Sequence, residues 1–169
     1  MKLLFTAGTQ FAFPRLQQAV DQVAEMQPDW QLTFQAGPGG QLAGLPKRPN
    51  VLARPLFGSD EFERLFATAD LVVSHAGMGN IIACLEADKP LVLLPRQAKL
   101  GEHRNNHQMD TAEAFQRMYN VPAAQSVAEL VVAVTDTARW PQGEKGAAER
   151  LHRTRSAFAK NINVLLGEL

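Results

Sequence analysis

The chain has 169 residues, of which 46% are hydrophobic and 20% are charged, values that suit one globular domain with a buried core. Seventeen Lys and Arg residues balance seventeen Asp and Glu residues, which disfavours function through nonspecific binding to nucleic acid or an anionic membrane. No apolar run approaches the ~18 residues of a membrane span, and the N-terminal one is too short for a signal peptide. The single cysteine, Cys84, permits no internal disulfide, so we expect a cytoplasmic protein.

The first half of the chain alternates predicted strands and helices. In chain order these are a strand at 3–6, a turn at 8–10, a helix at 15–26, strands at 31–35 and 51–53, a helix at 59–67 and a strand at 71–73. Apolar residues at 16, 19, 20 and 23 share one face of the first helix, as an amphipathic helix requires. Ser59 is expected to cap the second helix.

The second half continues the alternation. Its predicted elements are a helix at 80–87, a strand at 91–94, a polar loop at 96–106, a helix at about 108–118, an extended piece at 121–123, a helix beginning after a Ser126 cap and reaching 137, a connector at 140–145 and a final helix at 147–166. The unbroken apolar run at 91–94 is typical of a strand covered on both faces. The final helix is amphipathic, and its apolar stripe either covers the sheet or forms a surface for a partner or a homodimer.

Strands that alternate with helices predict an α/β fold, with an open parallel sheet and helices on both faces, in a single domain over 1–169. In such sheets ligands bind at the carboxyl ends of the strands. The turn at 8–10 and the loops at 75–80 and 96–107 all follow predicted strands. We therefore expect the functional site where these three segments meet.

The most informative segment is Ser74-His75-Ala76-Gly77-Met78-Gly79-Asn80, hereafter the glycine loop. It joins a buried strand to a helix, and glycines let backbone N–H groups approach a ligand closely. The first turn of a helix adds unpaired N–H donors and the positive end of its dipole, so phosphate or diphosphate is the expected guest. Asn80 could contact that anion, cap the helix, or do both.

A second polar segment, Gly101 to Gln108, is hereafter the histidine loop. If it is helical, His103 and His107 share a helix face at a spacing that permits a zinc pair. The sequence offers no evident third ligand, and neighbouring Asn105, Asn106 and Gln108 suit hydrogen bonds to sugar and phosphate better. We therefore expect no metal.

Together the segments 69–80, 89–90 and 101–108 resemble the C-terminal, donor-binding half of a GT-B glycosyltransferase of family 28, over residues 1 to about 118. The chain is most similar to stand-alone versions, namely the catalytic subunit of the eukaryotic dolichol-linked N-acetylglucosamine transferase and PssE-type subunits of bacterial exopolysaccharide transferases. The resemblance implies a Rossmann-like domain that binds a UDP-sugar.

The resemblance also implies a set of substrate-binding residues. Carried over position by position, they are Gly8, Thr9, Gln10, His75, Gly77, Met78, Gly79, Asn80, Glu102, His103, His107 and Gln108. One position departs from the family pattern: Ala83 stands where a carboxylate usually holds the ribose hydroxyls. Glu86, three residues later, lies on about the same helix face, roughly 4.5 Å further along.

The implied reaction is inverting transfer of a sugar from a UDP-sugar to a lipid-linked oligosaccharide acceptor, without a cofactor. In related two-domain enzymes the acceptor-binding domain supplies the general base, so we assign none to this chain. A membrane-associated, PssD-like partner subunit is expected to supply it, to bind the acceptor and to recruit this chain to the inner face of the membrane. The alternatives are a noncatalytic nucleotide-sugar-binding or regulatory subunit, and a nucleotide-sugar 2-epimerase, which would need both domains in one chain.

Overall fold

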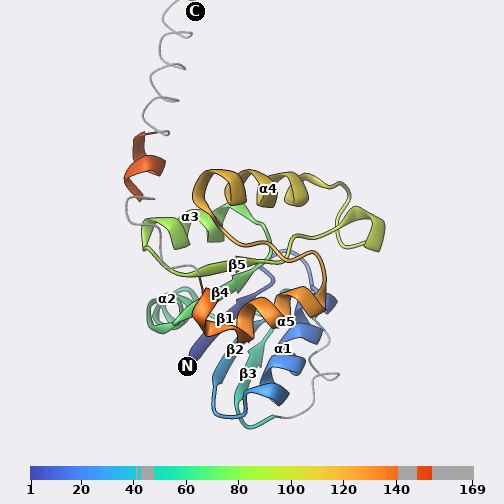
Figure 1. The fold of residues 1–169 in the computed structure, drawn as a ribbon. Helices are drawn as coiled ribbons and strands as arrows, with labels where there is room; N and C mark the ends of the chain where they lie inside the picture. Colours follow the sequence, from blue (N-terminus) through green and yellow to red (C-terminus); the bar gives the residue numbers. More distant parts are fainter. Residues whose placement is uncertain (41, 43–47, 141–147, 154–169) are drawn as a thin grey trace, which may run out of the picture.

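The computed structural model describes residues 1–40, 42, 48–140 and 148–153. Five strands alternate with five helices among them (Figure 1). The strands are β1 (Lys2–Thr6), β2 (Gln31–Gln35), β3 (Val51–Arg54), β4 (Leu71–Ser74) and β5 (Leu91–Leu93). The helices are α1 (Pro14–Met26), α2 (Ser59–Thr68), α3 (Met78–Glu86), α4 (His107–Tyr119) and α5 (Val127–Thr135), with short 3₁₀ turns at Ala98–Leu100 and Thr137–Arg139.

All strands are parallel and lie in the order β3-β2-β1-β4-β5, which confirms the predicted open α/β sheet. The chain changes direction across the sheet between β3 and β4, so β1 and β4 are neighbours at its centre. The predicted extended piece at 121–123 meets the edge strand through one parallel bridge from Ala123 to Leu93. The carboxyl ends of β1 and β4 therefore open side by side at the switch point, where ligands bind in such sheets.

Two hydrophobic clusters cover the two faces of the sheet. On one face α1 and α5 pack against alternate strand residues such as Phe5 and Val73. On the other, α3 and α4 contribute Ile81 and Phe115, which pack in one cluster with Val72. This alternation explains why the strands read as continuous apolar runs: both sides of each central strand are buried.

The helix ends follow the local sequence, with one correction. Ser126 caps α5 as predicted, its Oγ accepting a hydrogen bond of 3.2 Å from the backbone N–H of Glu129. For α2 the prediction is wrong: the N-cap is Gly58, which holds the extended backbone before the helix, and Ser59 is already the first helical residue. The first turn of α2 nonetheless carries Asp60 and Glu61, which complement the helix dipole.

The described part of the final helix covers residues 148–153, and the remainder of the predicted 147–166 lies outside the described residues. Leu151 is buried in the same cluster as Tyr119, so this turn covers the core. Trp140 closes the core on the other face, where its indole N–H donates to the carbonyl of Val134, whereas the rest of the predicted connector is outside the described part. Among the described helices, none combines the length and apolar character that crossing a bilayer requires.

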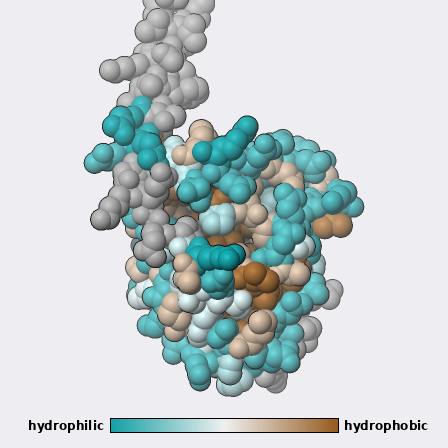
Figure 2. Space-filling model, in the orientation of Figure 1, coloured by the Kyte–Doolittle hydropathy of each residue, from teal (hydrophilic) through white to brown (hydrophobic). Residues whose placement is uncertain are grey.

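The outer face of α5 is partly apolar, and Val132 leaves 63% of its surface exposed. Beside it lies a hollow of about 520 Å³, lined mainly by small and apolar side chains of α5 together with Val92 and Pro122. Figure 2 shows apolar surface on this side of the molecule. This hollow is on the α5 side of the sheet, separate from the switch point.

Candidate functional site

A cavity of about 570 Å³ lies at the carboxyl edge of the sheet, where the loops after four of the strands meet the first turn of α2. It is lined by Ala7, Gly8, Thr9, Gln10, Phe11, Gln35, Phe57, Ser59, Phe62, Glu63, His75, Gly77, Gly79, Asn80, Arg96, His103, His107 and Gln108. The structure thus brings together all the sequence-predicted site residues except Met78 and Glu102. Segments separated by about a hundred residues in the chain share this one space.

The glycine loop leads directly into α3. Gly77 is the N-cap, and no side chain caps the helix, so the first backbone N–H groups keep their donor capacity at the cavity wall. The capping prediction for Asn80 is wrong, because this residue lies inside the first turn. Its side-chain amide donates instead to Ser74 Oγ at 2.9 Å, which fixes it at the cavity wall.

His75 fits tightly between two glycines. Gly8 has a φ of +83°, and a Cβ at this position would lie 2.6 Å from His75 Cε1. A Cβ at Gly77 would also collide with the imidazole ring. The close approach of the ring therefore favours glycine at both positions, and at Gly8 the positive φ favours it as well.

The environment keeps the His75 imidazole neutral at pH 7. Burial, followed by the positive charge of Arg96, lowers its pKa from 6.5 to about 4. His75 Nδ1 lies 3.5 Å from the carbonyl oxygen of Thr6, so the single N–H of the neutral ring donates to that carbonyl in one tautomer and is free to form a hydrogen bond to a phosphate oxygen in the other. Negative charge brought beside the ring would raise its pKa and strengthen that bond.

The histidine loop lacks the helical arrangement on which a zinc pair would depend. His107 is the first residue of α4, while His103 lies in the preceding bends, so the two do not share a helix face. Their rings nevertheless meet edge to face, with centroids 4.5 Å apart. His103 Nδ1 is buried without a hydrogen-bond partner among the described residues, which leaves a polar atom for a ligand to satisfy. Within the described ranges, no group of three or more His, Cys, Asp or Glu side chains could hold a metal ion.

Gln108 lies at the buried end of this loop. Its side chain is almost fully buried, and its Oε1 accepts a hydrogen bond of 3.1 Å from the backbone N–H of Arg96. The carbonyl end of the amide is therefore fixed by the chain segment after β5. Its amide nitrogen remains the group with which Gln108 can donate to a ligand.

Two predicted site residues do not line the cavity. Glu102 accepts hydrogen bonds from Arg15 Nε and Nη2 at 2.6 and 2.7 Å, and from the backbone N–H of Gln97 at 2.9 Å. Its carboxylate is thus already engaged, and it ties the histidine loop to α1. Met78 begins α3 with 50% of its surface exposed and is absent from the lining, so only its backbone position belongs to the glycine loop.

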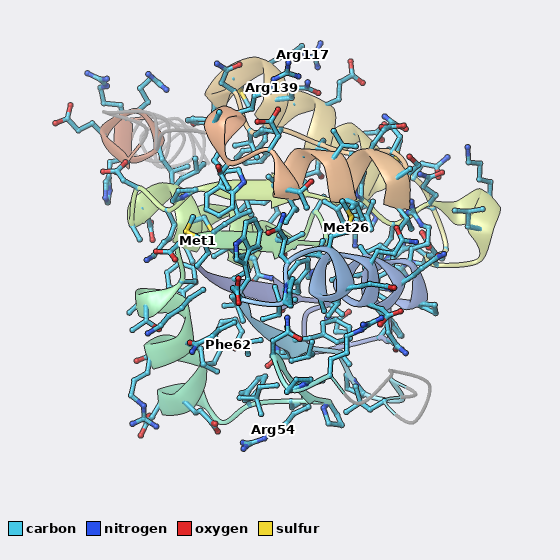
Figure 3. All side chains as sticks on the ribbon, turned by 60° about the horizontal axis from the view of Figure 1, so that its bottom comes forward. Met1, Met26, Arg54, Phe62, Arg117 and Arg139 are labelled. Atoms are coloured by element: carbon cyan, nitrogen blue, oxygen red, sulfur yellow. The ribbon has the colours of Figure 1, made fainter. Side chains whose placement is uncertain are left out.

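Several lining residues escaped the sequence analysis. Gln35 is the last residue of β2, Phe57 follows β3 and Arg96 follows β5, so applying the carboxyl-end rule to every strand would have found them. Phe62 and Glu63 come from the first turns of α2, and Phe62 lies on the side facing the sheet (Figure 3). Neither Ala83 nor Glu86 lines the cavity, whereas Glu63 does, as its one acidic side chain among the described residues.

Comparisons with known proteins identify relatives of this chain and structures with a similar fold. The UDP-N-acetylglucosamine transferase subunit ALG13 of Eremothecium gossypii is 37% identical over 99 residues, 54% of this chain and 47% of that protein. The chain spans less than half the length of the curated relatives it matches. Among solved structures, ALG13 in solution has a TM-score of 0.57 and 21% identity, covering 89% of this chain and 94% of that one. The calicheamicin glycosyltransferase CalG4 has a TM-score of 0.63 and 22% identity, covering 98% of this chain and 43% of that one.

The structural similarities, at these identities, establish the fold, which is that of the C-terminal half of a GT-B glycosyltransferase. The sequence comparison goes further, because the glycosyltransferase family 28 C-terminal domain matches residues 2–163, nearly the whole chain. The chain therefore belongs to the family of glycosyltransferase family 28 C-terminal domains.

Proposed function

We propose that this chain is the donor-binding subunit of a split, inverting glycosyltransferase that transfers a sugar from a UDP-sugar to a lipid-linked acceptor in polysaccharide synthesis. The observation that carries the proposal is the convergence of the turn at 8–10, the glycine loop and the histidine loop on one cavity. Backbone donors and imidazole side chains at that cavity suit a diphosphate flanked by sugar hydroxyls. The ALG13 relatives make UDP-N-acetylglucosamine the first donor to test.

The two ends of the cavity suit different parts of such a donor. Phe57 and Phe62 provide aromatic surface at the α2 end, where a uracil ring can pack. Glu63 stands beside them and, among the described residues, has neither a hydrogen bond nor an ion pair. A carboxylate repels phosphate and accepts from hydroxyls, so we assign Glu63 to the ribose hydroxyls in place of the missing carboxylate at Ala83.

In the transfer itself, an acceptor hydroxyl attacks the anomeric carbon, the bond to the diphosphate breaks, and negative charge grows on the leaving UDP. Donors at the first turn of α3, together with His75 and the amide nitrogen of Gln108, would stabilise that charge more strongly in the transition state than in the ground state. The described residues offer no evident general base near an acceptor position. A membrane-associated partner subunit, which binds the lipid-linked acceptor on the cytoplasmic face, would supply that base.

Calorimetry with UDP, UDP-N-acetylglucosamine and a panel of other UDP-sugars tests the donor site. We expect binding by the wild-type chain, a tenfold or greater loss in His75→Ala, and no change in His152→Ala, which alters an exposed histidine away from the cavity. Failure of every uridine nucleotide to bind a folded chain at millimolar concentration would contradict the donor-site proposal.

A second experiment tests the need for a partner. Sugar transfer to a lipid-linked acceptor is measured with this chain alone and after addition of an acceptor-binding subunit. We expect transfer only from the mixture, because the general base is assigned to the partner. Equal rates with and without the partner would refute the split arrangement while leaving the donor site intact.

One observation favours the noncatalytic alternative. Neither Ala83 nor Glu86 reaches the cavity, so if Glu63 does not hold the ribose, the nucleoside end is weakly bound. A chain that binds UDP-sugars but supports no transfer with any acceptor-binding partner would be a regulatory nucleotide-sugar-binding subunit.

A further inference from the structure

Arg96 is a buried cation at the cavity whose charge has no direct carboxylate partner among the described residues. Only 2% of its surface is exposed, and the nearby carboxylate of Glu102 is engaged by Arg15. Its guanidinium instead lies over the ring of Phe13, with Cζ 4.4 Å from the ring centroid. Burying an ion without a direct ion pair is unfavourable, so the position of Arg96 calls for an explanation beyond packing.

The guanidinium donates all of its assigned hydrogen bonds to the loop that joins β1 to α1, residues 7–13. Its Nη2 donates to the carbonyls of Ala7 and Phe11 at 3.0 and 2.7 Å, and its Nη1 donates to the carbonyl of Ala12 at 2.7 Å. One planar group thus gathers three carbonyl oxygens of a single turn. Arginine can do this because its donors are arranged in a rigid fork.

The carbonyls that Arg96 holds flank the part of the loop, Gly8 to Gln10, that lines the cavity. A fourth carbonyl, that of Gly8, accepts from the buried Gln35 side chain at 3.3 Å. The backbone N–H groups of Thr9 and Gln10, by contrast, donate to no acceptor among the described residues, and both residues line the cavity. Two successive N–H groups without a protein acceptor, in a loop that lines the cavity, can form an anion-binding concavity.

We propose that Arg96 is a positioning residue that shapes the β1–α1 loop into a diphosphate-binding loop and places beneath it a positive charge that forms no direct ion pair among the described residues. The inference rests on the proposed donor site and assigns the diphosphate end of that site to a residue outside both sequence motifs. If the role of Arg96 were purely structural, its substitution would lower the stability of the protein and would weaken binding of every part of the ligand equally.

The test compares Arg96→Met, which removes charge and donors, with Arg96→Lys, which keeps the charge but lacks the fork. Arg48→Met is the matched control, since Arg48 pairs with Asp21 and Glu25 away from the cavity. Binding of inorganic pyrophosphate, UDP and uridine is measured by amide chemical shifts, and hydrogen exchange of residues 8–11 reports loop order. We expect Arg96→Met to lose about 10- to 100-fold in affinity for UDP and pyrophosphate, the range for hydrogen bonds to charged groups. Uridine affinity should change less than twofold.

Arg96→Lys should show faster exchange in residues 8–11 and a smaller loss of UDP affinity, and Arg48→Met should match the wild type. If Arg96→Met does not fold, the UDP affinity of Arg96→Lys and the hydrogen exchange of its residues 8–11 test the proposal instead. Wild-type affinity for UDP in folded Arg96 variants overturns the inference, as does an equal loss for UDP and uridine. Failure of the wild-type chain to bind pyrophosphate also overturns it. Pyrophosphate binding without uridine-nucleotide binding leaves the anion loop standing and refutes the donor function.

Discussion

Replacing Gly8 by alanine should destabilise the protein through two separable effects. The first is backbone strain, because a φ of +83° costs an alanine about 1–2 kcal/mol. The second is steric, because the new Cβ would lie 2.6 Å from His75 Cε1, and such overpacking typically costs about 1–3 kcal/mol. We therefore expect Gly8→Ala to lower the free energy of unfolding by about 2–5 kcal/mol.

Gly39 provides the matched control. It has a φ of +76°, and a Cβ there would meet no atom within 4 Å, so Gly39→Ala isolates the strain term. The difference between the two variants is the collision with His75, and combining Gly8→Ala with His75→Ala should recover it as a coupling energy of about 1–3 kcal/mol. Urea unfolding followed by tryptophan fluorescence measures all four variants. Equal stabilities of Gly8→Ala and Gly39→Ala, or a coupling energy near zero, would refute the close packing of His75 against Gly8.

Three further predictions concern titration, ligand recognition and thiol reactivity. The pKa of His75 is about 4 in the folded protein and 6.5 as the reference value for the unfolded chain, so on acidification the unfolded chain binds the proton first. The free energy of unfolding should therefore fall by roughly 3 kcal/mol as the pH drops from 6.5 to 4. Acid titration of His75→Gln should lack that loss. Glu63→Ala should abolish a preference of about 10-fold or more for UDP over 2′-deoxy-UDP, while Glu86→Ala retains it; a preserved preference in the Glu63 variant would remove this residue from the ribose site. Burial raises the pKa of Cys84 to about 12, so a thiol reagent at pH 8 should label the protein only on unfolding, and rapid labelling of native protein would contradict the buried position.

The sheet could be predicted from the sequence because its central strands β1 and β4, and β5 beside them, are buried on both faces. The apolar run at 71–73 was predicted correctly as part of a strand, and the predicted span of β2, 31–35, was exact. In a parallel sheet covered by helices, the apolar residues of such strands are buried. Helix boundaries were less accessible, as at α2, where glycine and serine are adjacent and either can precede a helix. Burial patterns thus identify elements more reliably than their ends.

The site was partly accessible for a different reason. Local motifs identified the glycine loop and His103, His107 and Gln108, because those groups are close in the chain and follow strands. The roles of Glu102 and Arg96 were not accessible, since their partners lie more than eighty residues away. Sequence spacing cannot tell whether a carboxylate faces a ligand or an arginine when the arginine belongs to another element.

The hydrogen bonds from Arg96 to the carbonyls of the β1–α1 loop also affect when, during synthesis, the chain can begin to bind a ligand. Strands β1, β2 and β3 can pair from the first 54 residues, soon after these leave the ribosome. The carbonyls of Ala7, Phe11 and Ala12 must wait for a donor synthesised more than eighty residues later. A nascent chain that stops just before Arg96 would contain all five strands without a finished β1–α1 loop. Capture of nucleotide by ribosome-bound chains should therefore begin only after β5 and the histidine loop have emerged.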